Sequence, residues 1–508
     1  MMLFNTADSI CWLSGAALLY LVLSTLLRAA YNLWLHPARH FPGPWPWAAF
    51  HVFKDLTCAR GNIDARLCQL HAQYGPVVRI SPDELSFVDQ RAWRDIYARP
   101  NYLEKWPRFA FVNNKNDTPA DIINSSHVDH ARIRRQLSYA FSDKALREQE
   151  GLIRQYIDLL LAKLSDAAAS GAPINMVKWY NLTTFDIVSD LAFGQSFSSL
   201  NKGEYHPWVA AVFKNIRAFN VVRSFATYPG AKLIIGLLSS SDLHEARKIH
   251  KEYSRTTVQN RLARGVLEER RDFISYTLKH KDEAGIGQAM STGEIIRTAS
   301  TLIMAGSETT ATVLSGLTYF LAMNPDALSK VTHEVRSTFK SESEITFENA
   351  SSRLPYLLAC FDETLRMYPP VPFLSPRLTP PGVTHIAGHE VPGGMGVGVA
   401  RLATTRNPTA FFESGRFHPE RWLPSARKPG SPFYHDARDC FQSFLLGPGA
   451  CLGRNLAYHE MRTIMSRILW RFDIEICAPS QHWLKGQRSY VIWDKPPLMC
   501  RLLPRVLY

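Results

Sequence analysis

Cys451 lies in a loop whose composition favours a bound cofactor. The loop, residues 444–453, reads FLLGPGACLG, so glycines stand close to the sulfur on both sides. A backbone without Cβ atoms leaves room for a flat ligand to approach. Residues 454–462 contain neither Gly nor Pro and are expected to form a helix, whose N-terminus would favour a metal-binding thiolate. An isolated cysteine is more often a small buried hydrophobe, but these glycines favour a seat for a large planar cofactor.

A second segment that could do chemistry is AGSETT, residues 305–310. Ser291 and Glu294 form a capping-box pattern, and the proline-free stretch that follows predicts a helix of about 45 Å. The glycine within it costs a helix about 1 kcal/mol, and local inconsistency of this kind often marks a functional site. Glu308 could donate a proton, and the Thr309 hydroxyl could relay it.

Two interpretations of this segment stay open. Ala305 and Gly306 are small enough to let a planar ligand approach the helix. The glycine could instead serve close packing between helices, and the Thr309 hydroxyl could bond back to a main-chain carbonyl.

Charged residues with regular spacing follow in two further segments. Glu363 and Arg366 are three residues apart in a predicted helix that begins at Pro355, so they share a helix face and can pair. Such a pair is common and is worth less than about 1 kcal/mol when exposed. Arg421 lies in the segment FHPERW, residues 417–422.

Together these motifs resemble those of the cytochrome P-450 family. Its haem-binding loop has the pattern Phe-x-x-Gly-x-Arg-x-Cys-x-Gly, of which four fixed positions match here, while Gly449 replaces the arginine. The resemblance implies that this arginine would contact a haem carboxylate, so Gly449 removes one expected partner of the haem. The segment 305–310 matches the family's oxygen-binding pattern, Ala/Gly-Gly-x-Asp/Glu-Thr-Thr/Ser. The resemblance covers essentially the whole chain in the family's order. It implies a mainly α-helical fold with a small β-rich subdomain.

The resemblance also implies a role for each matching residue. Cys451 would be the axial ligand of the haem iron, where a thiolate favours O–O cleavage. Thr309 would hold bound oxygen, and Glu308 would pass protons from solvent. The residues expected to contact haem b are His130 in the place of a family tryptophan, Arg134, Ala305, Gly306, Arg377, Phe444, Gly447, Cys451 and Gly453.

A structural role is implied for the spaced charges. Glu363, Arg366 and Arg421 would form a buried triad whose planar guanidinium groups support the cysteine loop. Removal of any member would leave a buried charge without its partner.

The composition indicates a large folded unit. The chain has 508 residues, of which 46% are hydrophobic and 20% charged, and no internal repeat or long flexible linker divides it after residue 50. We therefore expect one catalytic domain over residues 51–508. The eight cysteines are too few and too irregularly spaced for a disulfide framework or a zinc site. The net charge of +13 comes without a basic block or a nucleic-acid-binding module, so no nucleic-acid partner is expected.

The N-terminal segment is apolar enough to cross a membrane. Residues 10–27 form an uncharged run of 18 residues, about 27 Å long as a helix. A cleaved signal peptide is the alternative, but no basic segment precedes the run, and Arg28 and Arg39 follow it. We therefore expect residues 1–30 to be a single-pass anchor in the endoplasmic reticulum membrane with the catalytic domain in the cytosol. Residues 31–50, rich in proline, would be a stiff hinge.

The resemblance implies a haem-thiolate monooxygenase that inserts one oxygen atom from O2 into a lipophilic small molecule, by hydroxylation or epoxidation. Electrons would come from NADPH through NADPH-cytochrome P-450 reductase, with cytochrome b5 as a further partner. The segment ARIRR, residues 131–135, resembles the corresponding segment of filamentous-fungal members that act in secondary metabolism. The nearest alternative is a haem-thiolate isomerase or dehydratase, and a non-catalytic haem sensor is a more distant one. The pair Glu308 and Thr309 argues against both alternatives, because it serves proton delivery.

Three segments are expected on the substrate side. By resemblance, the loop 101–129 would roof the haem pocket. The segment from Trp208 to Leu238 would be either packed core or a mobile lid that touches the membrane. Phe373 and Leu374, after a proline-rich turn, would face the substrate, although none of these residues identifies it.

Overall fold

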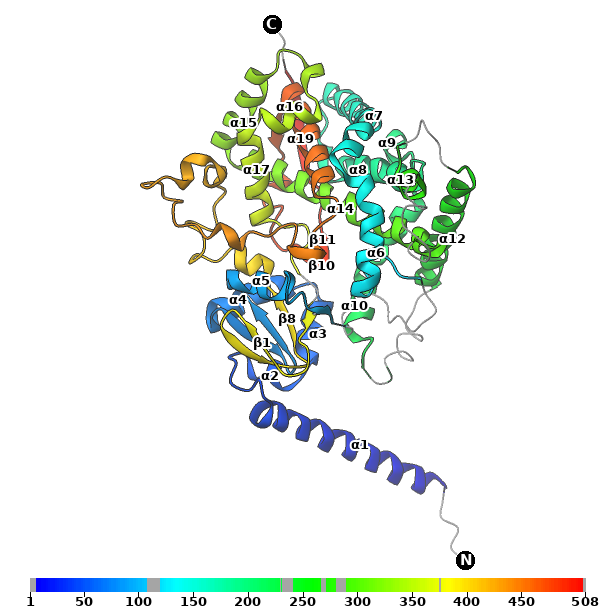
Figure 1. Ribbon diagram of the computed structural model, residues 1–508, viewed down its shortest axis with the longest axis vertical. Helices are drawn as coiled ribbons and strands as arrows, with labels where there is room; N and C mark the ends of the chain where they lie inside the picture. The colour runs from blue at the N-terminus through cyan, green and yellow to red at the C-terminus, as the bar shows by residue number, and fades with distance from the viewer. Residues whose placement is uncertain are drawn as a thin grey trace, which may run out of the picture.

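A long helix extends from the N-terminal end of the molecule. In the computed structural model, α1 (Thr6–Ala30) projects away from the body (Figure 1) and continues as a π-helical turn, η1 (Tyr31–Leu35). The stretch Trp12–Leu35 has 24 residues and a mean hydropathy of 1.6, and among the described residues it alone is a helix long and apolar enough to cross a membrane. The structure describes residues 6–106, 119–228, 230, 241–265, 271–279, 289–373 and 376–505.

This helix ends later than the uncharged run indicates. It enters the predicted hinge because the five residues Tyr31–Leu35 contain no proline, and it stops before Pro37. Its end is attached to the body. The Asn32 side-chain amide donates to the Ala49 carbonyl at 2.9 Å, and the Asn32 carbonyl accepts from Arg79 Nη1 at 2.9 Å.

A small β-rich part lies next to this attachment (Figure 1). Its five-stranded sheet has the order β1-β2-β8-β5-β3, in which β2 and β8 run parallel and the other neighbours antiparallel. The register pairs Lys105 of β3 with Arg377 of β5, so two cations lie on adjacent strands. The elements of this part are α2 (Trp45–Ala49), α3 (Val52–Ala59), α4 (Ile63–Tyr74), β1 (Val77–Ser81), β2 (Glu84–Phe87), α5 (Gln90–Tyr97), β3 (Glu104–Lys105), β5 (Arg377–Leu378), β8 (Gly396–Val399) and the hairpin of β6 (Val383–Ile386) with β7 (His389–Pro392).

The larger part of the molecule is helical and is built around α14 (Thr292–Met323). The predicted capping box is confirmed, because the Ser291 hydroxyl accepts from the Glu294 N–H and the Glu294 carboxylate accepts from the Ser291 N–H. Apolar residues of α14 are buried against α8 (Met176–Phe193) in one large hydrophobic core. Other helices of that core are α7 (Asp143–Ala169), α17 (Pro355–Met367) and α19 (Arg454–Arg471).

The fold is therefore mainly α with small sheets, as the sequence predicts. Near the C-terminus, a three-stranded sheet of order β4-β12-β9 and the hairpin β10–β11 border the helices. Further elements are α6 (His127–Ser138), β4 (Ile174–Asn175), α9 (Ser199–Lys202), α10 (Pro207–Phe225), α12 (Ser241–Ala263), α13 (Phe273–Lys279), α15 (Pro325–Thr338), α16 (Phe347–Ser352), α18 (Arg401–Thr405), β9 (Phe472–Ile476), β10 (Arg488–Tyr490), β11 (Ile492–Asp494) and β12 (Met499–Pro504).

Candidate functional site

The cysteine loop is folded back on itself and rests on the end of α5. The Cys451 N–H donates to the Phe444 carbonyl at 2.8 Å, which closes the loop. Gly447 has φ +64°, and a Cβ there would lie 2.4 Å from the Tyr97 carbonyl oxygen. This position therefore requires glycine because of a close backbone contact. Gly453 is less constrained, since its nearest neighbour, a Phe141 ring carbon, lies at 3.7 Å. Gly447 is therefore needed for the packing of the loop against α5, and not only to leave room for a ligand.

The sulfur of Cys451 lies where α19 begins. Gly453 caps this helix, and its N–H donates to the sulfur. Among the seven cysteines whose side chains the structure describes, only Cys451 is exposed to solvent. Burial among protein atoms nevertheless raises the pKa of the Cys451 thiol, and the Gly453 N–H and the charges of Arg134 and Arg401 oppose this only in part. The Gly453 N–H at the start of α19 thus acts against the effect of burial, and a cation bound to the sulfur would favour the thiolate further.

Four basic side chains gather beside this loop, and we call Lys105, His130, Arg134 and Arg377 the cationic cluster. Arg134 of α6 donates to the carbonyl of Ala450 at 2.5 Å and so holds the loop. Burial and the charge of Arg377 lower the pKa of Lys105 to about 8. Burial and the charges of Lys105, Arg134 and Arg377 lower the pKa of His130 to about 4, so this histidine is a neutral hydrogen-bond partner at pH 7.

The cationic cluster suits an anionic group. The charge of Arg377 lowers the pKa of Lys105, and the charges of Lys105, Arg134 and Arg377 lower the pKa of His130; a bound anion would relieve that repulsion. Two buried polar atoms nearby, the Tyr102 hydroxyl and His127 Nε2, have no hydrogen-bond partner in the described part of the chain. Cations together with unpaired donors beside an accessible cysteine fit the carboxylates and the iron of haem.

The segment 305–310 lies within α14, and its side chains have separate partners. The Thr309 hydroxyl donates to the Ala305 carbonyl at 2.6 Å. A Cβ on Gly306 would lie 3.2 Å from both methyl groups of Val188 on α8. The sequence leaves two interpretations of this segment open. The observed contacts are those of the second one, in which Thr309 bonds back to the main chain and Gly306 serves close packing between helices.

Glu308 is 1% exposed and forms a buried ion pair with Lys495, which follows β11. The same ammonium donates to the Thr312 hydroxyl at 2.8 Å. Glu308 Oε2 has no partner among the residues that the structure describes. Burial raises the pKa of Glu308, and the charge of Lys495 opposes that shift. Although Glu308 and Thr309 are adjacent in sequence, they do not share a hydrogen bond.

No pattern in the sequence predicts that Lys495 lies beside Glu308. It is a single lysine ahead of two prolines, 187 residues away from its partner. Only the return of the β10–β11 hairpin to α14 brings the two together.

Glu363, Arg366 and Arg421 are in direct contact, and each side chain is fully buried. Arg366 binds both oxygens of Glu363 at 2.8 Å, and Arg421 Nε lies 3.0 Å from the same carboxylate. Burial alone would raise the pKa of Glu363, but the hydrogen bonds and charges of the two arginines outweigh it and hold the pKa below its usual value.

Two further residues, Trp422 and Asp436, also contact this triad, and the sequence did not predict either contact. Trp422 Nε1 donates to Glu363 at 2.9 Å, and Arg421 also pairs with the buried carboxylate of Asp436. The spacing of Asp436 from Arg421 gives no hint of this contact, because the segment between them is irregular. Arg366 additionally donates to the carbonyls of Thr405 and Ser414 at 2.8 Å. The charged group thereby ties α17 to the segments that precede the cysteine loop.

The expected substrate-side residues are described in part. Phe373 is buried, and Trp208, at the start of α10, is a fully buried core residue. Leu374, residues 107–118 of the predicted roof and residues 231–238 of the predicted lid lie outside the described residues.

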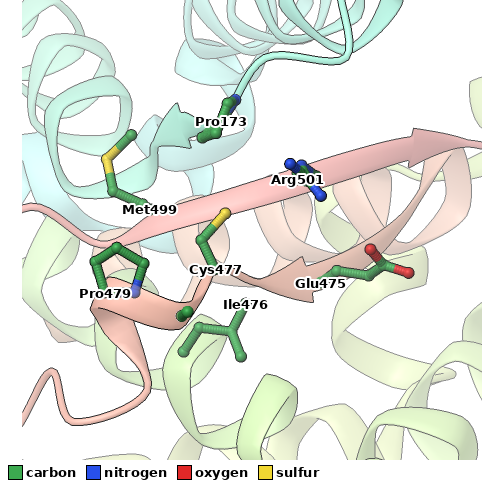
Figure 2. A pocket seen from close by; sticks show the side chains of 8 residues that line it. Pro173, Glu475, Ile476, Cys477, Pro479, Met499 and Arg501 are labelled. Atoms are coloured by element: carbon green, nitrogen blue, oxygen red, sulfur yellow. The ribbon is translucent and has the colours of Figure 1, made fainter.

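A surface groove of 470 Å³ lies elsewhere, along β9 and β12 (Figure 2). It contains Cys477 but none of the predicted site residues, so it does not belong to the candidate site. Its lining residues are Pro173, Glu475, Ile476, Cys477, Ala478, Pro479, Met499 and Arg501.

Comparisons with known proteins agree with this arrangement. The family model described as cytochrome P-450 matches residues 40–501. The chain is 44% identical over 488 residues to the trichothecene C-4 hydroxylase of Trichoderma arundinaceum, covering 96% of each chain. It is 42% identical over 485 residues to the cytochrome P-450 monooxygenase olcB of Penicillium canescens, covering 95% of this chain and 97% of the relative. It is 39% identical over 490 residues to the averantin hydroxylase of Dothistroma septosporum, covering 96% and 90%.

These similarities span nearly the whole chain and agree with the accessible cysteine, the cationic cluster and the buried triad. Similarity over 488 residues is much stronger evidence for the family than a match to the ten-residue cysteine loop alone. The chain therefore belongs to the cytochrome P-450 family and is a haem-thiolate monooxygenase.

Proposed function

We propose that this monooxygenase hydroxylates a lipophilic small molecule in a pathway of fungal secondary metabolism. The observation that carries the proposal is the 44% identity, over 96% of both chains, to an enzyme named for hydroxylation of a trichothecene. A second relative is named for hydroxylation of averantin. In such a reaction, one atom of O2 enters a C–H bond and the other leaves as water.

The residues of the site support a bound haem b, which supplies the oxygen-activating chemistry. Cys451 offers a sulfur at the start of α19 for the iron. Arg134 and Arg377 offer permanent cations for the haem carboxylates, and His130 offers a neutral ring nitrogen. The contacts of Phe444, Gly447 and Gly453 shape the loop that presents the sulfur.

Thr309 and Glu308 are proposed to manage protons. The Thr309 hydroxyl already donates its proton to the Ala305 carbonyl, so toward a ligand its oxygen can act as an acceptor. Glu308 is held by Lys495 through one oxygen and has the other unpaired among the described residues. A carboxylate with one free oxygen can take up a proton there and pass it on.

We also propose an electron supply and a location for this enzyme. Electrons are proposed to come from NADPH through NADPH-cytochrome P-450 reductase, with cytochrome b5 as a further donor. The helix α1 with η1 is the proposed anchor in the endoplasmic reticulum membrane, with Arg28 on the cytosolic side. The hinge is then the shorter, proline-containing stretch 36–50 rather than 31–50, ahead of the catalytic domain 51–508.

Expression of the full chain with a reductase in yeast microsomes tests the proposal. The reduced, CO-bound protein is expected to show a thiolate-type Soret band that Cys451→Ser lacks. A fungal strain without the gene is expected to accumulate a precursor that contains one oxygen atom less than the wild-type product, and microsomes with NADPH should convert it. Turnover without NADPH would support an isomerase or dehydratase instead, and absence of the Soret band in the wild type would refute the haem site.

A further inference from the structure

Gly449 stands where the family's haem-binding loop has an arginine, and other side chains fill the space beside it. A Cβ on Gly449 would lie 3.2 Å from the Tyr102 hydroxyl oxygen and 3.4 Å from Arg377 Nη2. A contact of 3.2 Å is tighter than nine in ten real Cβ contacts, so even an alanine would require Tyr102 to shift by a few tenths of an ångström. The direction in which an arginine would leave the loop is thus taken by Tyr102 and Arg377.

The backbone explains how Tyr102 reaches this place. The cysteine loop touches the end of α5 at Gly447, where the missing Cβ allows contact with the Tyr97 carbonyl. The chain then turns, and the Tyr102 N–H donates to the Ala98 carbonyl at 2.8 Å. This turn brings the tyrosine beside Gly449.

The ring of Tyr102 is fixed from two directions. It stacks on the His127 ring with centroids 4.3 Å apart and an interplanar angle of 23°. His127 is itself held by Glu104, 2.9 Å from its Nδ1. The guanidinium of Arg377 lies 5.1 Å from the centre of the Tyr102 ring. A ring clamped in this way aims its hydroxyl in one direction, at little further entropic cost on binding.

The hydroxyl itself lacks a partner. It is buried and makes no hydrogen bond within the described part of the protein. A buried hydroxyl is normally hydrogen-bonded, so a group from outside the chain is the expected acceptor. Because the Arg377 guanidinium lies against the Tyr102 ring and also beside Gly449, that acceptor should be an anion.

We propose that Tyr102 donates a hydrogen bond to a haem carboxylate and so provides the contact that the family's arginine provides from position 449. Tyr102 is a positioning residue: it holds the cofactor and takes no part in the oxidation. The inference rests on the proposed haem site at Cys451. It goes further by assigning the replacement for the missing arginine to one hydroxyl group.

Tyr102→Phe tests this assignment, because it removes one oxygen atom and keeps the ring contacts. The readout is the rate at which the purified ferric protein loses haem to excess apomyoglobin. Loss of a hydrogen bond to a charged group predicts haem transfer about tenfold or more faster than in the wild type. The bending band of the haem carboxylates in the resonance Raman spectrum should shift as well.

Tyr97→Phe is the matched control. Tyr97 also lies beside Arg377, at 5.6 Å, but its hydroxyl accepts from the Val399 N–H at 3.3 Å. This variant should leave the haem-carboxylate band unchanged and should not accelerate haem loss tenfold. An equal effect of both variants would overturn the assignment, since general loosening around Arg377 would then explain it.

The double variant Tyr102→Phe/Gly449→Arg supplies a second test. Removal of the Tyr102 hydroxyl removes the atom closest to a side chain at position 449. The arginine should therefore restore slow haem loss in Tyr102→Phe, whereas Gly449→Arg alone, with Tyr102 still present, should not slow haem loss. A thiolate-type Soret band in every variant shows that the haem site itself is intact. With that band present, wild-type haem retention in Tyr102→Phe refutes the inference and leaves the proposed function standing.

Discussion

Glu363 is the residue on which the buried charged contacts ahead of the cysteine loop converge. Its two oxygens accept from Arg366, Arg421, Trp422 and the main chain of His418, all in a fully buried setting. A buried ion pair adds little net stability, but removal of one partner leaves an uncompensated charge. The main contribution of this carboxylate is therefore to hold Arg366, Arg421, Trp422 and the main chain of His418 in fixed positions. Its attraction to any single arginine matters less.

Replacement of this carboxylate is expected to abolish haem incorporation. Glu363→Gln leaves the buried guanidinium of Arg366 without its charge partner and leaves Arg421 with Asp436 alone, at a cost of about 3–5 kcal/mol in the free energy of unfolding. The measurement is the ratio of haem to protein in purified membranes. Glu420→Gln is the control, because Glu420 lies in the same segment but pairs with the exposed Lys330. Normal haem content in Glu363→Gln would contradict the supporting role.

Glu460 on α19 illustrates the opposite case, a buried acid without a partner. It is 1% exposed, and neither carboxylate oxygen has a hydrogen bond with the residues described. Burial raises the pKa of Glu460 to about 8. The folded protein therefore keeps a proton on Glu460 at neutral pH that the unfolded chain would release.

This difference makes the stability depend on pH. Between the unfolded value of 4.5 and the folded value of about 8, the native state binds the extra proton, so stability falls as pH rises, by about 1.4 kcal/mol per pH unit at most. Glu460→Gln removes the titrating group, and thermal unfolding followed from pH 5 to about pH 8 should show a flatter profile than the wild type. The gain should be largest at the alkaline end. Parallel profiles for both proteins would show that Glu460 is not protonated in the fold.

At the scale of elements, the sequence predicts single helices better than the contacts between them. The capping box at Ser291 and the spacing of Glu363 and Arg366 are local patterns, and both occur as such in the structure. The packing of Gly306 against Val188 depends on how α8 lies along α14, which no local pattern contains. The same holds for Tyr102 at Gly449, because this contact depends on the loop meeting the end of α5.

The ion pair between Glu308 and Lys495 is also a contact between elements, and it has a measurable consequence. Burial raises the pKa of Glu308, while Lys495 is the leading influence in the opposite direction. Lys495→Met should therefore raise the Glu308 pKa further and favour the protonated form of this acid. A protonated carboxyl group has a C=O stretching band in the infrared spectrum that a carboxylate lacks.

Infrared spectra of the purified variants at neutral pH provide the measurement. Lys495→Met should show the carboxyl band, and the band should vanish in Lys495→Met/Glu308→Gln. Lys495→Arg keeps the positive charge and should resemble the wild type. If Lys495→Met lacks the band, the ammonium does not control the protonation of Glu308.

At the scale of the whole molecule, the N-terminal helix is the proposed membrane anchor and is also attached to the catalytic domain. The helix α1 projects away from the body (Figure 1). Its apolar side chains are exposed along most of its length, in contrast to the packed core of the catalytic domain. The end of the same helix, at Asn32, is bonded to Ala49 and to Arg79, which is 1% exposed. A truncation can therefore remove the anchor alone or damage the domain, depending on where it begins.

Two truncations should separate these roles. A chain that lacks residues 1–30 keeps Asn32, so it should retain its haem and its thermal stability but become extractable from membranes by alkaline carbonate, unlike the full chain. A chain that lacks residues 1–36 leaves Arg79 Nη1 without its acceptor, which costs about 1–3 kcal/mol and should lower the Tm. Equal Tm values for the two truncations would show that the attachment is unimportant. Carbonate resistance of the first truncation would show that α1 is not the membrane anchor, because the residues that could still hold the chain in the bilayer would then lie in the catalytic domain.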